Sequence, residues 1–456
     1  MHTQSADVSI IGLGKLGASM LAGMASRGIK VIGVDVSPQA VEAINQGRGP
    51  VDETNLDATI SAHADKVRAT LDYEDAVHNT SISFVIVPTP SDEHGAFSLR
   101  YAAKCFASIG KALRTKSDYH VVVLTSTVLP GATRHGLLPV LEKESGKKCG
   151  TDFGLCYNPE FIALGSVIRD FLNPDFYLLG QFDERSGDAL EAVHRRVSAN
   201  NAPVKRMNLE NAEIAKIAVN SFVTLKISYA NMLAGLCEKI PGADIDVVSD
   251  AIGADSRIGK KYLKGGLAFG GPCFPRDNVA LAFIGKHLGV DTSILQVNDA
   301  FNRKHSATLL ENLSGYIPAT GKAAVLGLAY KPFSHVIEES ASIVLCKTLE
   351  AKGYQVTAYD PLANETAKRA LGPDFAIADS MENCVADADI VFIATADPQF
   401  AHLEARHLKS SGAYVIDFWR FLDGSFKGKD GVTHISGGRC LDPMAAEQTL
   451  TQLWKM

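Results

Sequence analysis

The segment Ser9-Ile10-Ile11-Gly12-Leu13-Gly14-Lys15-Leu16-Gly17 decides the fold of the N-terminal part of this chain. A short apolar strand runs directly into the pattern G-x-G-x-x-G, which joins the first strand and the first helix of a dinucleotide-binding βαβ unit. Gly12 permits the tight turn, Gly14 lets a pyrophosphate approach the backbone, and Gly17 allows close packing of helix against strand. The helix N-terminus then faces the phosphates. On its own the pattern is weak, because glycine-rich turns are common.

Asp35 supports the dinucleotide interpretation. It ends the next predicted strand, eighteen residues after Gly17. An acid at this position hydrogen-bonds the ribose hydroxyls and repels a 2′-phosphate, so the sequence predicts NAD rather than NADP. The alternative is a plain βα turn with a helix-capping aspartate. We favour the cofactor site because the position, the order and the acid all agree.

Residues 7–205 alternate β-branched runs with amphipathic segments, which is typical of a parallel sheet with crossover helices. The expected strands are residues 7–11, 30–34, 83–87 and 120–124. The expected helices include residues 14–27 and 101–113. This part of the chain therefore predicts a Rossmann-like domain.

The alternation stops at residue 208. From there to about residue 252, apolar residues recur at three- and four-residue spacing, which predicts one long buried helix. The residues that carry this spacing are Ile214, Ile217, Ala218, Phe222, Leu225 and Tyr229. A second helix is expected around residues 275–288.

From residue 322 the alternation returns. Strands are expected at residues 323–328, 355–359, 390–394 and 414–417, with helices such as residues 342–352 between them. We therefore predict an α/β protein with two Rossmann-like, doubly wound parallel-sheet domains joined by a central helical region. The predicted domains are residues 1–205, 206–305 and 306–456.

The composition is that of a globular protein. The chain has 456 residues, and 45 basic against 51 acidic side chains give a net charge of −6, with no long block of like charge. Nucleic acid and membranes are therefore poor candidates for partners. No segment reaches the ~18 uninterrupted apolar residues of a membrane span. The eight cysteines are scattered with no C-x-x-C pair, so we expect reduced thiols in a soluble, cytoplasmic protein.

The stretch Gly270-Gly271-Pro272-Cys273-Phe274-Pro275-Arg276-Asp277 points to covalent chemistry. Pro275 suits the first position of a helix and Gly289 its C-terminal cap, so Cys273 would lie just before a helix N-terminus. There the helix dipole and nearby cations lower a thiol pKa and make the thiol a nucleophile. Asp277 follows four residues later, close enough to act as an acid–base group. We expect the other seven cysteines to be small buried hydrophobes.

Four further features keep an alternative open. Lys216 and Asn220 share one face of the central helix, where the lysine polarises a ligand or merely snorkels at the surface. Residues 158–161, Asn-Pro-Glu-Phe, place a carboxylate at a strand end or form a turn with a solvated glutamate. Residues 87–90 and 126–131 follow predicted strands where ligands bind, or are only proline-stiffened turns.

These motifs occur in one order, together with Arg257-Ile258-Gly259 and residues 325–332. In that order the chain resembles the UDP-glucose/GDP-mannose 6-dehydrogenase family over almost its whole length. The resemblance implies an NAD-dependent, four-electron oxidation of the C6 alcohol of a nucleotide sugar to a carboxylate. The first hydride transfer gives an aldehyde, which Cys273 attacks to form a thiohemiacetal. A second NAD takes a hydride, and water hydrolyses the thioester.

The resemblance also implies residue roles. Cys273 carries the intermediate, Lys216 and Asn220 stabilise oxyanions, and Thr127, Glu160 and Asp277 position water and move protons. Cofactor contacts are implied for Gly12, Gly14, Leu16, Gly17, Asp35, Thr89, Thr127 and Arg276. Substrate contacts are implied for Phe161, Arg257, Phe269, Gly270 and Lys331. Arg257 matches a residue that reaches the neighbouring subunit's substrate, and no metal is implied.

The family's domains correspond to residues 1–205 for NAD, 206–305 for dimerisation and 306–456 for the nucleotide sugar. A homodimer or higher homo-oligomer is therefore expected. The chain departs from the family pattern at Leu164, where a carboxylate is usual, and at Met232, where the family has glutamate. Arg276 replaces a lysine and keeps the charge but not the shape. Glu338 replaces an arginine that contacts the substrate's phosphates, which reverses a charge.

These departures leave the catalytic residues intact and the sugar and base open, with a UDP-glucose-like substrate as the first expectation. One alternative is a two-electron β-hydroxyacid dehydrogenase, which also joins a dinucleotide domain to a helix with Lys-x-x-x-Asn. That class needs neither a cysteine nor a second αβ domain. Another alternative is an NAD-responsive binding protein that has lost its chemistry.

Overall fold

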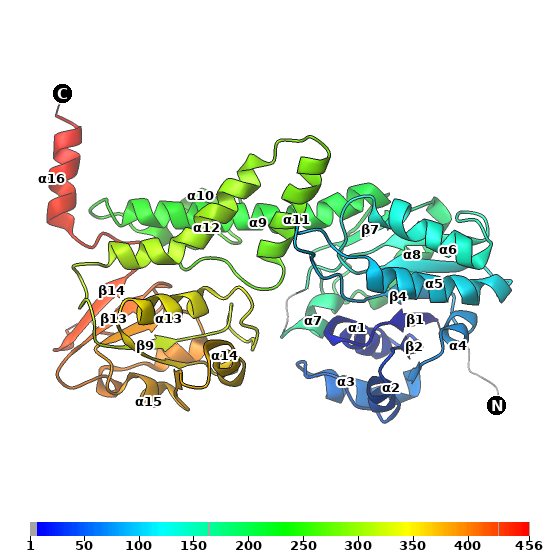
Figure 1. Cartoon of the computed structure of the whole chain (residues 1–456), viewed down its shortest axis with the longest axis horizontal. Helices are drawn as coiled ribbons and strands as arrows, with labels where there is room; N and C mark the ends of the chain where they lie inside the picture. The colour runs from blue at the N-terminus through cyan, green and yellow to red at the C-terminus, as the bar shows by residue number, and fades with distance from the viewer. Residues whose placement is uncertain (1–6, 163–164, 427, 456) are drawn as a thin grey trace. The chain divides into compact units, whose positions relative to one another are not determined.

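The structure, a computed structural model, describes residues 7–162, 165–426 and 428–455. It forms two compact units. One runs to Val219 and includes Phe283–Leu288, and the other comprises Asn220–Ala282 and the residues from Gly289 onward. Each unit contains one sheet flanked by helices (Figure 1). The predicted α/β class with two Rossmann-like sheets is confirmed, while the domain boundaries at residues 205 and 305 stay predictions.

The first sheet has eight strands in the order β3-β2-β1-β4-β5-β6-β7-β8. Its first six positions follow the doubly wound order 3-2-1-4-5-6. Neighbouring strands are parallel except β6 and β7, which are antiparallel. The strands are β1 Val8–Ile11, β2 Val31–Val34, β3 Val67–Thr70, β4 Ile82–Val85, β5 His120–Leu124, β6 Phe153–Tyr157, β7 Tyr177–Gln181 and β8 Val204–Asn208. The four strands expected here correspond to β1, β2, β4 and β5.

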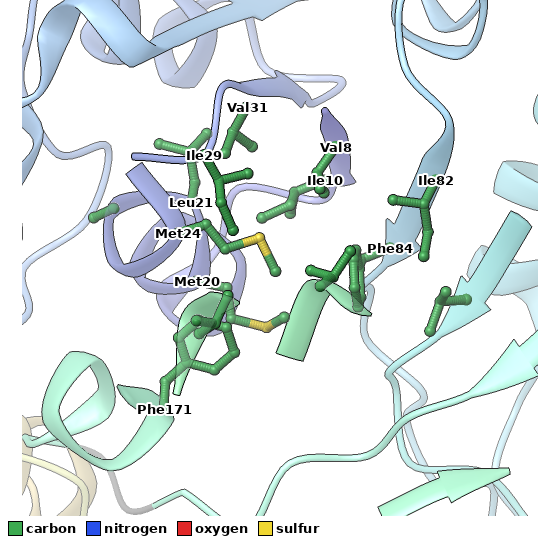
Figure 2. Close-up of a cluster of buried hydrophobic side chains, with 14 of the residues drawn as sticks. Val8, Ile10, Met20, Leu21, Met24, Ile29, Val31, Ile82, Phe84 and Phe171 are labelled. Atoms are coloured by element: carbon green, nitrogen blue, oxygen red, sulfur yellow. The ribbon is translucent and has the colours of Figure 1, made fainter. Parts of the chain in front are cut away.

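Helices cover both faces of this sheet, because successive strand residues point to opposite sides. Val121 and Val123 of β5 belong to one buried cluster, and Val122 and Leu124 belong to the other. Figure 2 shows part of the first cluster, where β1, β2 and β4 pack against α1 and α7. The helices of this unit are α1 Lys15–Ser26, α2 Pro38–Asn45, α3 Leu56–Ala62, α4 Tyr73–His78, α5 Arg100–Thr115, α6 Leu138–Ser145, α7 Val167–Leu172 and α8 Glu184–Val197, with a 3₁₀ turn η1 Ala64–Lys66 and a π-helix η2 Ala132–Leu137.

The second sheet has six strands in the order β11-β10-β9-β12-β13-β14, all parallel. The strands are β9 Lys322–Leu326, β10 Gln355–Tyr359, β11 Ala376–Ile377, β12 Ile390–Ile393, β13 Ala413–Asp417 and β14 Val432–Ser436. The helices are α13 Ala341–Ala351, α14 Asn364–Leu371, α15 Met381–Val385 and α16 Pro443–Leu453, with 3₁₀ turns η3 Pro398–His402 and η4 Ala405–His407. The four strands and the helix expected here are present within a residue or two at each end.

The turn after β9 is closed by a buried acid. Gly327 has a φ of +98°. Asp360, which follows β10, accepts hydrogen bonds from the backbone N–H groups of Leu328 (2.7 Å) and Ala329 (3.0 Å) with one oxygen. Its other oxygen accepts from two further backbone N–H groups, and the residue is 5% exposed. Asp360 is therefore committed to the fold of this turn.

The four remaining helices are α9 Leu209–Cys237, α10 Ile245–Gly253, α11 Phe274–His287 and α12 Ser293–Asn312. The prediction of one helix to residue 252 is wrong, because α9 ends at Cys237 and α10 is separate. Pro241 between them has no N–H to continue a helix, and Gly242 has a φ of +78°. Within the single chain α9 is buried only in part, since Phe222 and Tyr229 are 62% and 52% exposed. No helix in the described part of the chain is long and apolar enough to span a membrane.

Candidate active site

The turn after β1 leaves room for an anion at a helix N-terminus. Gly12 has a φ of +98°, and a Cβ there would lie 2.0 Å from the carbonyl oxygen of Ile86. A Cβ on Gly17 would lie 1.8 Å from the Gly12 oxygen, whereas a Cβ on Gly14 would meet no atom within 4 Å. Gly14 is the N-cap of α1, and no side chain caps that end. The turn therefore has room for a pyrophosphate at the start of α1.

Asp35 lies at the same turn. One carboxylate oxygen accepts from the backbone N–H of Leu13 (2.7 Å) and the other from that of Ser37 (2.9 Å). Each oxygen has a second acceptor site, and the residue is half-buried rather than enclosed as Asp360 is. Asp35 is therefore able to accept from ribose hydroxyls. Leu16, another predicted contact, is the second residue of α1 and packs against the first core cluster.

The loops after β4 and β5 are joined to each other. Thr89 Oγ1 donates to the backbone oxygen of Thr127 at 2.7 Å. Ser126 Oγ donates to the backbone oxygen of Val87 (2.7 Å) and accepts from the N–H of the same residue (2.8 Å). The two loops form one connected edge at the carboxyl ends of parallel strands, where ligands bind in such sheets.

Glu213 fixes the end of the Thr127 loop, and sequence reasoning missed it. This residue lies in the first turns of α9 and is fully buried. Its Oε2 accepts from the N–H of Gly131 at 2.6 Å, and its Oε1 accepts from the N–H of Thr133 at 2.9 Å. Burial raises the pKa of Glu213, and these N–H donors act in the opposite direction. The only signal in the sequence is an acid at the start of an apolar helix.

Lys216 and Glu160 come together within the first unit. Lys216 Nζ donates to the Glu160 backbone oxygen at 2.7 Å and lies 4.4 Å from the centroid of the Phe161 ring. Lys216 is 7% exposed, so the snorkelling alternative does not hold. Glu160 Oε1 is buried, and no group in the described part of the chain hydrogen-bonds to it. Burial raises the pKa of Glu160 to about 8, partly offset by the charge of Lys216, which excludes a solvated glutamate and suits proton transfer near neutral pH.

The turn that carries Glu160 is anchored by Asn158. Its Nδ2 donates to the backbone oxygen of Leu178 at 3.1 Å, and its Oδ1 lies 2.8 Å from His194 Nε2. Because Oδ1 accepts, His194 Nε2 carries the hydrogen. Burial lowers the pKa of His194 to about 3, so this histidine is a neutral donor. The Asn-Pro-Glu-Phe turn is thus tied to β7 and α8.

Asn220 and Asp277 come together within the second unit. Asn220 Nδ2 donates to Asp277 Oδ2 at 2.6 Å, and the two residues are 9% and 1% exposed. Arg276 Nε lies 3.5 Å from Asp277 Oδ1. The two predicted catalytic residues and the predicted cofactor contact at Arg276 therefore form one polar cluster on α9 and α11.

Cys273 immediately precedes α11. Its carbonyl oxygen accepts from the N–H of Asp277 at 2.8 Å, which makes Cys273 the N-cap. The helix begins at Phe274, so Pro275 is its second residue rather than its first, while Gly289 follows the helix with a φ of +70°. All eight cysteines lie in the described part of the chain, and Cys273 alone is exposed. Burial raises the thiol pKa of Cys105, Cys149, Cys156, Cys237, Cys346 and Cys384.

The remaining predicted substrate residues belong to the second unit. Arg257 is exposed, with its Nη2 2.6 Å from Asp255 Oδ2. Lys331 Nζ lies 5.8 Å from the centroid of the Tyr330 ring. Phe269 and Gly270 are buried, and a Cβ on Gly270 would lie 2.1 Å from a backbone oxygen.

Of the departures from the family pattern, Met232 is 41% exposed on α9. Glu338 has an exposed side chain, and its backbone oxygen accepts from the N–H of Gly271 at 3.0 Å. Leu164 lies outside the described residues.

Comparison with known sequences gives one family. Three of its profiles match in order: UDP-glucose/GDP-mannose dehydrogenase family, NAD binding domain, over residues 6–198; the central domain of the same family, over residues 210–304; and its UDP binding domain, over residues 324–424. NAD is therefore the cofactor, in agreement with the glycine turn and Asp35.

Individual relatives cover nearly the whole chain. The UDP-glucose 6-dehydrogenase AglM of Haloferax volcanii is 37% identical over 420 residues, which is 91% of this chain and 97% of that protein. A GDP-mannose 6-dehydrogenase of Pseudomonas putida is 32% identical over 432 residues, 91% of this chain and 96% of its own. Among solved structures, a UDP-glucose dehydrogenase from Pyrobaculum islandicum superimposes with a TM-score of 0.83 at 32% identity, covering 96% of this chain and 99% of that one.

Proposed function

This chain belongs to the UDP-glucose/GDP-mannose dehydrogenase family, and from that premise we propose that it oxidises the C6 hydroxymethyl group of a nucleotide sugar to a carboxylate. The observation that carries the proposal is Cys273, an exposed thiol at the N-terminus of α11. It stands four residues before Asp277, which is buried against Asn220. The relatives named for UDP-glucose and GDP-mannose make these two nucleotide sugars the substrates to test first.

NAD, when bound, accepts a hydride in each of the two oxidations. Gly12, Gly14, Gly17 and Asp35 would hold it, with Thr89, Thr127 and Arg276 as further contacts. In the first oxidation the C6 hydroxyl loses its proton as the carbon becomes an aldehyde. The ammonium group of Lys216 stabilises the negative charge on the sugar oxygen, and the Asp277 carboxylate, held by Asn220, takes the proton.

The second oxidation needs a tetrahedral carbon that still bears hydrogen. Cys273 gives up its thiol proton, and its sulfur adds to the aldehyde carbon to form a thiohemiacetal. Lys216 and Asn220 stabilise the negative charge on its oxygen. Loss of the second hydride from that carbon leaves a thioester on Cys273.

Hydrolysis then releases the product. Water adds to the thioester carbon, the carbon–sulfur bond breaks, and the sulfur recovers a proton as the carboxylate leaves. Glu160, with a pKa raised to about 8, takes a proton from that water, and Thr127 positions it. A carboxyl group with this pKa is neutral in part at physiological pH, so it is able to accept and return protons in one turnover.

The decisive experiment counts NADH per sugar consumed, with UDP-glucose and GDP-mannose as substrates. We expect two NADH per sugar, whereas one would indicate the two-electron β-hydroxyacid class and none would favour a binding protein. In Cys273→Ser, turnover should fall by several decades with little change in the affinity for NAD and sugar. Cys149→Ser, which alters a half-buried cysteine of the first unit, is the matched control.

Alkylation supplies an independent readout. Iodoacetamide should modify Cys273 before the other cysteines, because it alone is exposed, and bound substrate should slow the reaction. The proposal fails if Cys273→Ser or Cys273→Ala still makes two NADH per sugar at a near-normal rate.

A further inference from the structure

Residues 265–271, here named the approach segment, lead into the Cys273 turn without regular secondary structure, although they are buried along nearly their whole length. A buried irregular segment has no helix or sheet ladder to satisfy its backbone N–H and C=O groups. Those groups must therefore find partners elsewhere. In this protein four buried polar side chains are partners for backbone groups of residues 265–269.

Asn231 of α9 holds the start of the approach segment. Its Oδ1 accepts from the N–H of Gly266 at 2.8 Å, and its Nδ2 donates to the backbone oxygen of Leu267 at 3.3 Å. Arg420 holds the residue before, because its Nη2 donates to the backbone oxygen of Gly265 at 2.8 Å. The same guanidinium forms a two-point contact with Asp246 at 2.9 Å for each pair of atoms, so the segment is fixed to α10 as well.

Two residues of α12 hold the rest. Asn302 Oδ1 accepts from the N–H of Phe269 at 2.9 Å, and Asn302 Nδ2 donates to the backbone oxygen of Phe269 at 2.9 Å. His305 Nε2 lies 2.8 Å from the backbone oxygen of Gly266. Because a carbonyl oxygen only accepts, that nitrogen carries the hydrogen, and burial lowers the pKa of His305, which keeps the ring neutral.

Three residues, Gly270, Gly271 and Pro272, separate Phe269 from Cys273, and the two glycines are tightly enclosed. A Cβ on Gly270 would lie 2.1 Å from the backbone oxygen of Glu339, and a Cβ on Gly271 would lie 2.6 Å from the Tyr330 ring. The N–H of Gly271 also donates to the Glu338 backbone oxygen at 3.0 Å. Because these two glycines cannot move freely, a displacement of the Phe269 backbone would be passed on to Cys273.

We propose that Asn302, assisted by Asn231 and His305, is a positioning residue for the covalent step. Its two hydrogen bonds to the Phe269 backbone fix the position of the backbone that leads to Cys273. This inference rests on the proposed function, in which Cys273 is the nucleophile. It assigns the α12 side chains no contact with substrate. Their effect on the reaction passes through the backbone of the approach segment.

The test replaces Asn302 by leucine, which has nearly the same shape and neither hydrogen-bonding group. Asn298→Leu is the matched control, because Asn298 is equally buried one turn earlier on α12 but donates to Thr224 Oγ1 (2.9 Å) and not to the approach segment. Since a misplacement of ~1 Å at a reacting group costs up to ~10²-fold in rate, we expect kcat to fall by about tenfold to a hundredfold in Asn302→Leu with KM little changed. Asn298→Leu should lose a similar amount of thermal stability and keep kcat.

A second readout does not depend on the proposed function. The rate at which iodoacetamide alkylates Cys273 in the absence of substrate should fall in Asn302→Leu and stay at the wild-type value in Asn298→Leu. Asn302→Asp is the milder variant if Asn302→Leu fails to fold, because it keeps the acceptor for the Phe269 N–H and loses the donor to its oxygen. A folded Asn302 variant with wild-type kcat and a wild-type alkylation rate overturns the positioning role. A changed alkylation rate together with full activity of Cys273→Ser would show that Asn302 positions the Cys273 thiol, and it would refute the proposed function.

Discussion

Glu160 gives a pH-dependent prediction whose size follows from its environment. Burial raises its pKa from the ordinary 4.5 to about 8. Between these two pH values the folded chain keeps a proton at Glu160 that the unfolded chain has released, so the stability of the folded state falls as pH rises. At about 1.36 kcal/mol per pH unit, the interval from 4.5 to 8 amounts to at most about 5 kcal/mol. This figure is an upper limit, because water reaches the outer part of the half-buried side chain.

Glu160→Gln removes this titration and keeps the size of the side chain. The variant should therefore gain thermal stability relative to the wild type as pH rises. One kcal/mol shifts Tm by about 2–4 °C in a domain of 150–250 residues, so the difference in Tm should grow by up to about 3–5 °C per pH unit between about pH 5 and pH 8. Differential scanning calorimetry of both proteins across that range measures it.

Glu74→Gln is the control, since Glu74 is exposed in the first turn of α4 of the same unit. Its Tm difference from the wild type should stay flat with pH. If the Tm difference for Glu160→Gln is equally flat, Glu160 is ionised throughout. The argument for a neutral, proton-transferring carboxyl would then be refuted.

Three further outcomes follow from the geometry. NAD should be preferred over NADP, and Asp35→Ala should narrow the preference; equal kcat/KM for both cofactors in the wild type would contradict the role of Asp35. The chain should be at least a dimer, because Phe222 and Tyr229 present an exposed apolar stripe on α9, and a monomer mass by light scattering at micromolar concentration would refute this. Glu213→Gln removes one of two acceptors for buried N–H groups at the Thr127 loop; it should destabilise the fold by ~1–3 kcal/mol and raise KM for NAD. Unchanged Tm and KM in that variant would show that the loop does not depend on the carboxylate.

Local patterns were sufficient for the cofactor turn and for the start of α11. The glycines of the first turn, Asp35 and the capping position of Cys273 depend on backbone geometry within one or two turns, and their spacing shows it directly. The parallel pairing of the central strands also follows from the alternation of strands and helices. Pro241 also marks the end of α9 in the sequence, although apolar residues recur on both sides of it.

Contacts between distant parts of the chain could not be predicted in this way. Glu213, Asn302 and His305 lie on long helices, and each binds backbone atoms far away in sequence. Every residue type carries the same backbone oxygen, and every type except proline the same N–H, so the sequence does not indicate which backbone group is the partner. The burial of Lys216 and Glu160 likewise depends on how β6, its following turn and α9 pack together, which spacing alone left undecided.

Changing the cofactor preference of this protein at Asp35 would also change the stability of the glycine turn of the first sheet. Asp35 accepts the N–H of Leu13 while its remaining lone pairs are available to a ribose, so in the proposed role one carboxylate would both brace the turn and contact the ligand. Asp360, the acid at the corresponding turn of the second sheet, accepts from four backbone N–H groups. Its carboxylate therefore serves only the fold of that turn. A variant engineered for NADP by deleting the Asp35 carboxylate would therefore lose turn stability together with the unwanted charge. A substitution such as Asp35→Asn, which removes the charge but keeps an acceptor for Leu13, separates the two effects.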